Sequence, residues 1–153
     1  MKRLKIGDII EIKTTKGVAY AQYTHRHPTY GALIRVFNRI YESSQSEFGS
    51  CIAGAPSFSC FFPLGAAVNR KIVQIVATGE VASDLREFPL FRAGVIDPAT
   101  KKVELWWIWD GEKEWQIGNL TEEQRKFPIR GVWNDTYLIE KIESGWTPEA
   151  DQF

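Results

Sequence analysis

Two histidines separated by one residue are the first candidates for chemistry in this chain. On a strand, His25 and His27 would project from the same face, as two ligands of one metal ion can. A protein metal site needs three or four ligands, however, and no Asp or Cys lies close to this pair in the sequence. We interpret the segment around the two histidines as a solvated loop, and we predict no metal site and no cofactor.

The sequence offers no recognisable nucleophile for covalent catalysis. Such catalysis needs a Ser or Cys beside a positioned base and an orienting third group. The pattern Gly-x-Ser-x-Gly does not occur, Cys51 and Cys60 have no recognisable flanking signature, and residues 49–54 lack the Lys and Ser/Thr that complete a phosphate-binding loop. Glu112 and Glu114 could form a glycosidase pair, but beside a predicted hairpin tip solvated charges are the commoner explanation. We therefore expect no catalytic residue and no enzyme.

A run of tryptophans and carboxylates between residues 104 and 115 is the strongest candidate for a binding surface. Three tryptophans fall within four positions and an Asp-Gly pair follows, which predicts an aromatic strand that ends in a hairpin. Because successive side chains on a strand point to opposite faces, Trp106 and Ile108 would share one face and Trp107 and Trp109 the other. The alternative for these aromatics is plain core packing, since large aromatic side chains are mostly buried.

Exposed aromatics within an acidic field are typical of a surface that attracts a basic protein partner. The residues predicted to bind such a partner are Trp107, Trp109, Asp110, Glu112, Glu114 and Trp115. If they do, charge reversal at Glu112 and Glu114 is expected to slow association.

The elements that must position these residues are mostly short strands. Apolar alternation and turn residues predict strands at Lys5–Lys13, Val18–Thr24, Ala32–Tyr41, Lys71–Thr78, Arg92–Ile96, 105–109, Glu114–Ile117 and one or two within Val132–Ile142. Short helices are predicted at Leu64–Arg70 and after the capping box of Thr121, and the longest loop at Glu42–Pro63. The sum predicts an α+β fold, predominantly antiparallel β, with a strongly bent sheet or half-barrel and one or two short helices.

Length and composition predict one domain over residues 1–153 without a membrane span. The basic N-terminus lacks the apolar run of an export signal, so we expect a cytoplasmic protein with Cys51 and Cys60 as free thiols. Residues 1–71 carry ten Lys or Arg against four Asp or Glu, and residues 72–153 carry nine against fifteen. The net charge is zero, which does not favour a nucleic-acid partner for the whole chain.

Three stretches carry a family resemblance. They are the opening Lys5–Ile12 with Val18–Tyr23 after a turn, the Trp-rich strand with its hairpin, and a closing segment that runs from Leu120 through Phe127-Pro128 to Ile139–Trp146. In these stretches the chain resembles the immunity protein 26 family of bacterial polymorphic toxin systems, while the segment 42–63 departs from that pattern. The resemblance implies a small cytoplasmic protein that binds and occludes a cognate toxin domain and needs no active site. It carries over no toxin-binding residue.

Two other functions fit the sequence. One is a nucleic-acid-binding module on a small barrel, with contacts from Lys2, Arg3, Lys5, Lys13, Lys16, Tyr20 and Tyr23. The other is a carbohydrate-binding or glycan-cleaving domain that uses tryptophans as stacking platforms.

Overall fold

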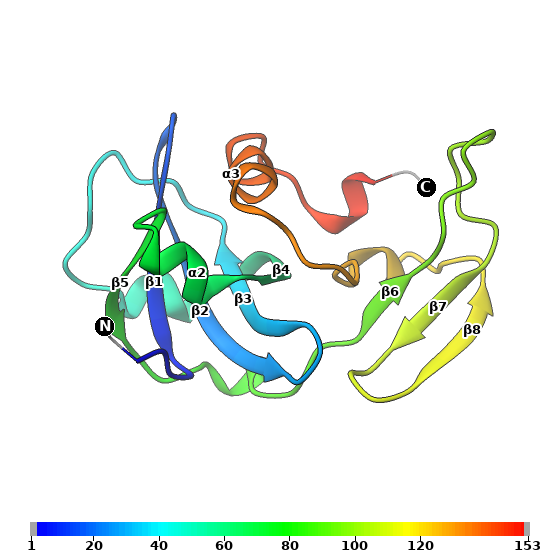
Figure 1. Ribbon diagram of the computed structural model, residues 1–153, viewed down its shortest axis with the longest axis horizontal. Coiled ribbons are helices and arrows are strands. Elements are labelled where there is room, and N and C mark those ends of the chain that lie inside the picture. The colour runs from blue at the N-terminus through cyan, green and yellow to red at the C-terminus, as the bar shows by residue number, and fades with distance from the viewer. Residues whose placement is uncertain (1–2, 152–153) are drawn as a thin grey trace. The chain divides into compact units, whose positions relative to one another are not determined.

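The computed structural model describes residues 3–151 and has an α+β fold with mostly antiparallel strands, as the sequence predicts (Figure 1). Its strands are β1 (Asp8–Thr14), β2 (Gly17–His27), β3 (Gly31–Phe37), β4 (Pro56–Phe62), β5 (Val73–Thr78), β6 (Phe91–Ala93), β7 (Trp106–Trp109) and β8 (Glu114–Gly118). Its helices are α1 (Gly49–Ala53), α2 (Leu64–Asn69) and α3 (Asp135–Glu143), with 3-10 turns η1 (Ser83–Leu85), η2 (Gln124–Lys126) and η3 (Pro148–Ala150). None of the described helices is long and apolar enough to cross a membrane.

The chain forms two compact units. The larger unit runs to Arg86 and takes up Gly131–Trp146, and the smaller unit comprises Glu87–Arg130 with the residues after Trp146. The single domain over residues 1–153 stays a prediction, because compact units of one chain can belong to one domain.

The larger unit is built on an open five-stranded antiparallel sheet with the order β4-β3-β2-β1-β5. The predicted hairpin of the first two strands is confirmed, with Ile12 opposite Ala19 and Thr14 opposite Gly17. At Gly17 φ is 138°, and a Cβ there would lie 2.3 Å from the carbonyl oxygen of Tyr41. Only glycine fits this turn, because it has the required conformation and leaves room for the neighbouring backbone.

Buried carboxylates in this sheet have specific partners. Asp8 is buried, and its carboxylate accepts hydrogen bonds from the backbone N–H of Lys5 at 2.9 Å and the Thr78 hydroxyl at 2.7 Å. Glu11 accepts a bond from the Tyr20 hydroxyl at 2.9 Å, and that hydroxyl accepts one from the Gln45 N–H at 2.7 Å. These bonds offset the cost of burying polar groups, so the two acids act as structural residues.

The predicted loop at Glu42–Pro63 contains two elements that the sequence did not reveal. Helix α1 and strand β4 both lie within it, and β4 pairs with β3, so that Leu33 is opposite Phe61 and Ile34 opposite Cys60. The Ser, Gly and Pro residues suggested a loop, but five consecutive residues of β4 are buried. Burial of Phe58, Phe61 and Phe62 outweighs the weak strand propensity of their neighbours.

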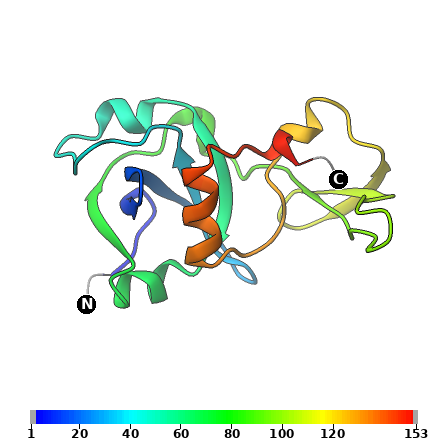
Figure 2. The same cartoon turned by 90° about the horizontal axis from the view of Figure 1, so that it is seen from above.

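The prediction of strands within Val132–Ile142 is wrong, because α3 occupies most of that segment. The side chain of Asn134 accepts a hydrogen bond from the Tyr137 N–H at 2.7 Å and so caps the helix. Leu138 and Ile142, four residues apart, are both buried. The helix lies along one side of the larger unit's sheet (Figure 2).

The smaller unit has an antiparallel sheet with the order β6-β7-β8. Thr121 and Gln124 form the predicted capping box, since each side chain bonds the other residue's backbone N–H, at 2.9 and 3.2 Å. Instead of the predicted short helix, however, only the 3-10 turn η2 follows, because the extended Phe127 precedes Pro128.

A buried arginine ties the last described segment to this sheet. Arg92 on β6 has no exposed surface, lies over the Trp106 ring with 5.1 Å from Cζ to the ring centroid, and donates a hydrogen bond to the carbonyl oxygen of Pro148. Burial lowers the pKa of Arg92, and the charge of Asp151 partly opposes that effect. The η3 turn is therefore held against the strand that begins the smaller unit.

Candidate binding surface

Strand β7 presents its tryptophans unequally. Trp106 and Ile108 are buried, whereas Trp107 is 36% exposed. Trp109, predicted to share an exposed face with Trp107, is only 6% exposed because Phe88 and Phe91 pack against it at centroid distances of 5.7 and 5.3 Å. Packing at the end of the strand thus removes Trp109 from the predicted contact surface.

The predicted surface is divided between two faces of the sheet. Trp115 is 43% exposed and pairs with Ile108, while Trp107 pairs with Gln116 and Trp109 with Glu114. Paired residues of an antiparallel ladder lie on the same face. Trp115 therefore projects opposite to Trp107, although both belong to the same hairpin.

The carboxylate of Asp110 serves the hairpin turn. Its Oδ1 accepts hydrogen bonds from the backbone N–H groups of Lys113 at 2.7 Å and Glu112 at 2.9 Å. These two bonds, that from Lys113 first, hold the pKa of Asp110 below its ordinary value. Asp110 is exposed, and its carboxylate primarily fixes the conformation of the loop.

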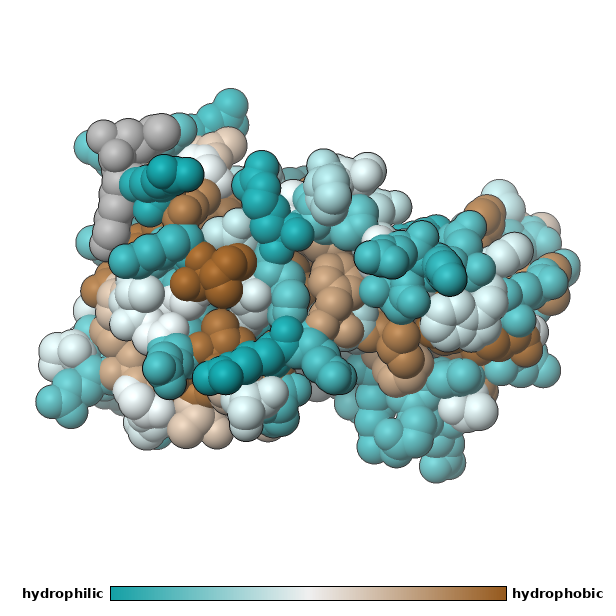
Figure 3. Space-filling view, turned by 90° about the horizontal axis from the view of Figure 1, so that it is seen from below, coloured by the Kyte–Doolittle hydropathy of each residue, from teal (hydrophilic) through white to brown (hydrophobic). Residues whose placement is uncertain are grey.

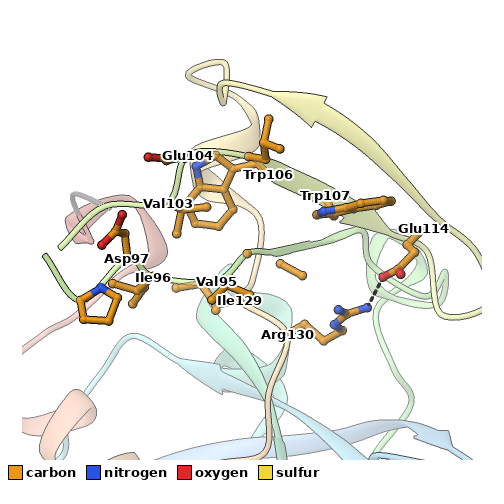
Figure 4. A pocket seen from close by; sticks show the side chains of 14 residues that line it. Val95, Ile96, Asp97, Val103, Glu104, Trp106, Trp107, Glu114, Ile129 and Arg130 are labelled. Atoms are coloured by element: carbon orange, nitrogen blue, oxygen red, sulfur yellow. Dashed lines mark hydrogen bonds and ion pairs between the residues drawn. The ribbon is translucent and has the colours of Figure 1, made fainter. Parts of the chain in front are cut away.

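Glu114 and Glu112 differ in their surroundings. The carboxylate of Glu114 lies 2.8 Å from the guanidinium of Arg130, which stands 5.5 Å from the Trp109 ring centroid (Figure 4). The side chain of Glu112 is exposed and has no hydrogen bond or ion pair with a described residue. Of the predicted hairpin acids, Glu112 is therefore the one left fully available to a partner.

A groove of about 590 Å³ lies beside Trp107 in the smaller unit. Its walls come from β6, β7, the connection between them, Glu114 of β8 and the chain at Ile129 and Arg130, as Figure 4 shows. At Gly94 a Cβ would lie 2.4 Å from a methyl carbon of Val103 and 3.3 Å from the Trp106 ring, so only glycine lets the chain pass this wall. The apolar side chains that line the groove are Ala93, Val95, Ile96, Pro98, Val103, Leu105, Trp106, Trp107 and Ile129.

Exposed apolar side chains are concentrated in the smaller unit. Among residues 3–151, nine large hydrophobic side chains are exposed, and six of them belong to this unit although it holds about a third of those residues. The six are Leu90, Val95, Ile96, Leu105, Trp107 and Trp115. Brown apolar patches among hydrophilic side chains on this unit are visible at the right of Figure 3.

Sequence reasoning missed the aliphatic part of this surface. Val95 is 87% exposed and Leu105 is 53% exposed. Val95 lay within the predicted strand Arg92–Ile96 and Leu105 within the predicted strand 105–109, and neither was predicted as a contact residue. The available signal was the adjacent turn, because Asp97 and Lys102 close the connection with a backbone hydrogen bond of 2.8 Å and leave its flanks outside the sheet.

The histidines lie at the end of strand β2 rather than in the predicted loop. His25 Nε2 is 2.8 Å from the Arg86 carbonyl oxygen, and His27 Nδ1 accepts from the N–H groups of Thr29 and Tyr30 at 3.1 and 3.2 Å. Burial is the main cause that lowers the pKa of His25. Over residues 3–151, no three His, Cys, Asp or Glu side chains are grouped as metal ligands.

Both cysteines are free and buried, as expected for the thiols. Burial raises the pKa of Cys51 and Cys60 alike. The thiolate is the reactive form of cysteine, so neither residue is disposed to act as a nucleophile at neutral pH.

The basic residues proposed for a nucleic-acid interface are dispersed. Tyr20 and Tyr23 are buried, so neither ring is available to stack on a base. Arg3 and Lys5 precede strand β1, whereas Lys13 and Lys16 lie at its far end, about 20 Å away at the usual rise per strand residue. Lys2 lies outside the described residues. The two tyrosines predicted to stack on bases therefore provide no stacking platform.

Comparison of the chain with family models, with curated proteins and with solved structures finds no match.

Proposed function

We propose that this protein binds a cognate bacterial toxin domain in the cytoplasm and neutralises it by occlusion, without catalysis of its own. The observation that carries the proposal is the concentration of exposed apolar side chains around the groove of the smaller unit. Soluble proteins rarely expose contiguous apolar surface unless it meets a partner. The resemblance of the chain's two ends to the immunity protein 26 family supplies the class of partner.

The contact surface centres on Trp107 and the groove beside it. Trp107 offers a large, partly exposed indole beside the aliphatic side chains of Val95 and Leu105. Partly buried aromatics held by a rigid strand are the usual source of binding energy in protein interfaces. Glu112 adds an exposed negative charge at the hairpin tip, which suits a basic partner. Trp115 would contribute only to contacts on the opposite face of the sheet.

The division of tryptophans between faces also bears on a carbohydrate partner. Sugar rings are held by aromatic platforms that face one cleft, and here Trp107 and Trp115 face opposite sides. A protein partner that meets the groove and the hairpin uses the exposed residues more fully. Titration with oligosaccharides, read by tryptophan fluorescence, separates the two functions.

Co-expression tests the proposal directly. The toxin domain encoded beside this gene is expressed in a sensitive host with and without this protein, and the two chains are then purified together. We expect rescue of growth and a stable complex. Growth arrest despite soluble expression of this protein, with no complex, would contradict the proposal.

A matched pair of variants separates occlusion from a general effect of expression. Leu105→Glu places a charge on the proposed surface, whereas Ile6→Glu places one on an exposed apolar residue of the larger unit. We expect the first substitution to abolish rescue and the second to preserve it. Equal rescue by both variants would move the contact away from the groove.

A further inference from the structure

The outer edge of strand β8 is open. The opposite edge of its sheet is covered, because the Arg92 N–H donates to the Pro128 carbonyl at 2.9 Å and the Arg130 N–H donates to the Arg92 carbonyl at 3.0 Å. Beyond β8 no described residue pairs with the sheet. Figure 1 shows β8 as the last strand on that side of its sheet.

The hairpin geometry determines which backbone groups face this open edge. The Asp110 N–H donates to the Lys113 carbonyl at 3.1 Å, so these two residues form a hydrogen-bonded pair. Such pairs alternate along an antiparallel ladder, which makes Ile108 and Trp115 the next hydrogen-bonded pair. The N–H and C=O groups of Glu114 and Gln116 therefore point away from β7 and towards the open edge.

The edge of β8 is short and carries one charged side chain, Glu114, and its backbone is open to a partner strand of matching length and charge. Residues 114–116 are exposed and contain no proline. Trp107 pairs with Gln116, but the next residue, Trp106, pairs with Gly118, so Ile117 has no partner and forms a bulge. Regular pairing is therefore limited to residues 113–116. Exposed strand edges of this kind are templates for pairing with another chain.

We infer that an extended, basic segment of the partner protein adds to β8 as a further strand. This inference rests on the proposed function and specifies how the partner is held. Backbone hydrogen bonds from Glu114 and Gln116 would supply register, and side chains of the added strand would alternate between the faces of Trp107 and Trp115. Both exposed tryptophans of the hairpin then contact one partner, although they lie on opposite faces.

Charge identifies the occupant as a partner rather than a second copy of this chain. Residues 110–114 carry three carboxylates and one lysine, and Arg130 pairs with only one of those carboxylates. Strand β8 carries no basic residue, so two copies paired through it would give Glu114 of neither strand a charge of opposite sign. A segment that carries Lys or Arg instead meets a field of opposite sign.

Amide hydrogen exchange, read residue by residue by NMR, tests the inference on the free protein and on its complex with the toxin domain encoded beside this gene. In the free protein we expect fast exchange at Glu114 and Gln116 and slow exchange at Trp115. In the complex we expect Glu114 and Gln116 to slow at least about tenfold, as hydrogen-bonded amides do. A complex that leaves both amides unprotected overturns strand addition and leaves the proposed function standing.

Two substitutions at one position separate the backbone from the side chain. Gln116→Pro removes the outward N–H, which an edge strand tolerates, whereas Gln116→Ala keeps it. We expect Gln116→Pro to weaken binding of the toxin domain about tenfold or more and Gln116→Ala to change it less than about threefold. Retained protection of the Trp115 amide shows that the hairpin is still folded in both variants. Equal affinities of the two variants would overturn the inference.

Sedimentation of the protein alone shows whether a second copy of this chain binds the β8 edge. A monomer at all concentrations supports a different protein as the occupant. A concentration-dependent dimer that slows exchange at Glu114 and Gln116 overturns the inference in favour of a second copy. If the toxin domain forms no complex at all, the proposed function itself is contradicted.

Discussion

The two units of this chain use aromatic residues for different ends. In the larger unit, Phe58, Trp133 and Trp146 pack against one another with centroid distances between 5.2 and 5.5 Å, and all three are buried. In the smaller unit, a three-stranded sheet leaves Trp107 and Trp115 partly exposed. Extensive burial stabilises the first arrangement, whereas the second keeps part of its aromatic surface exposed, as the proposed contact with a partner requires. The comparison separates residues that maintain the fold from residues available for binding.

Substitution of a buried aromatic in the larger unit should give the largest effect on stability. Phe61 is fully buried and stacks on Tyr30 at 5.1 Å, so Phe61→Ala should lower the free energy of unfolding by about 3–5 kcal/mol. Chemical denaturation followed by tryptophan fluorescence measures the change. Phe61→Leu keeps most of the volume and should cost about 1.5 kcal/mol. If both variants lose the same free energy of unfolding, the neighbouring side chains close over the space left by the ring, and the expected cost of a cavity is contradicted.

Trp107→Ala should have the opposite effect, with a large loss of affinity for the partner and a small loss of stability. We expect it to weaken binding of the toxin domain about thirtyfold or more, as loss of an interface anchor does. Because the ring is partly exposed, its removal should lower the free energy of unfolding by only about 1–2 kcal/mol. Isothermal titration and denaturation measure the two quantities. Tyr137→Ala is the matched control, because Tyr137 is 41% exposed in the larger unit and should leave affinity unchanged. Loss of affinity in both variants would contradict the placement of the binding surface on the smaller unit alone.

Charge reversal at the hairpin tip should affect the rate of association. We expect Glu112→Lys to slow association with a basic partner about three- to tenfold at low salt, with little effect on dissociation. Stopped-flow mixing at several salt concentrations measures this rate. Glu140→Lys reverses an exposed charge on α3 and serves as the control. A larger effect from the control would place the charge-sensitive surface on the larger unit.

The smallest predicted effect is a pH dependence within the larger unit. Burial is the main cause that lowers the pKa of His25 from its ordinary value of 6.5. The unfolded chain therefore takes up a proton before the folded one, and stability should fall as the pH drops from about 6.5 towards the lower folded pKa. Denaturation at a series of pH values should show a shallower decline for His25→Gln. An unchanged decline would assign the effect to other groups.

Local patterns predicted the elements whose side chains alternate regularly. The β1–β2 hairpin, helix α2 and the β7–β8 hairpin all lie where the sequence placed them, within a few residues. The capping box of Thr121 was also recognised, but the extended backbone of Phe127 shortens the helix to one 3-10 turn. Local signals therefore gave the position of that turn and not its length.

The elements that were missed depend on contacts between distant residues. The apolar residues of α3 also fit a strand, and packing of Leu138 and Ile142 decides for a helix. In the candidate surface, the ion pair of Glu114 with Arg130 joins residues sixteen positions apart. The burial of Trp109 likewise depends on Phe88, which no spacing rule connects with it. The aromatic and acidic residue types of the candidate surface could be predicted from the sequence, but the exposure of each side chain could not.

The division of the larger unit into two chain segments has a consequence for its synthesis. Trp133 and Trp146, which cover Phe58, follow the whole sheet of the smaller unit in the chain. Strand β4 also lacks one hydrogen bond until Trp133 is made, because the Trp133 N–H donates to the Phe61 carbonyl at 2.9 Å. As the chain leaves the ribosome, the aromatic face of β4 stays uncovered until residue 146 has emerged, and this interval is when a chaperone would protect the nascent protein.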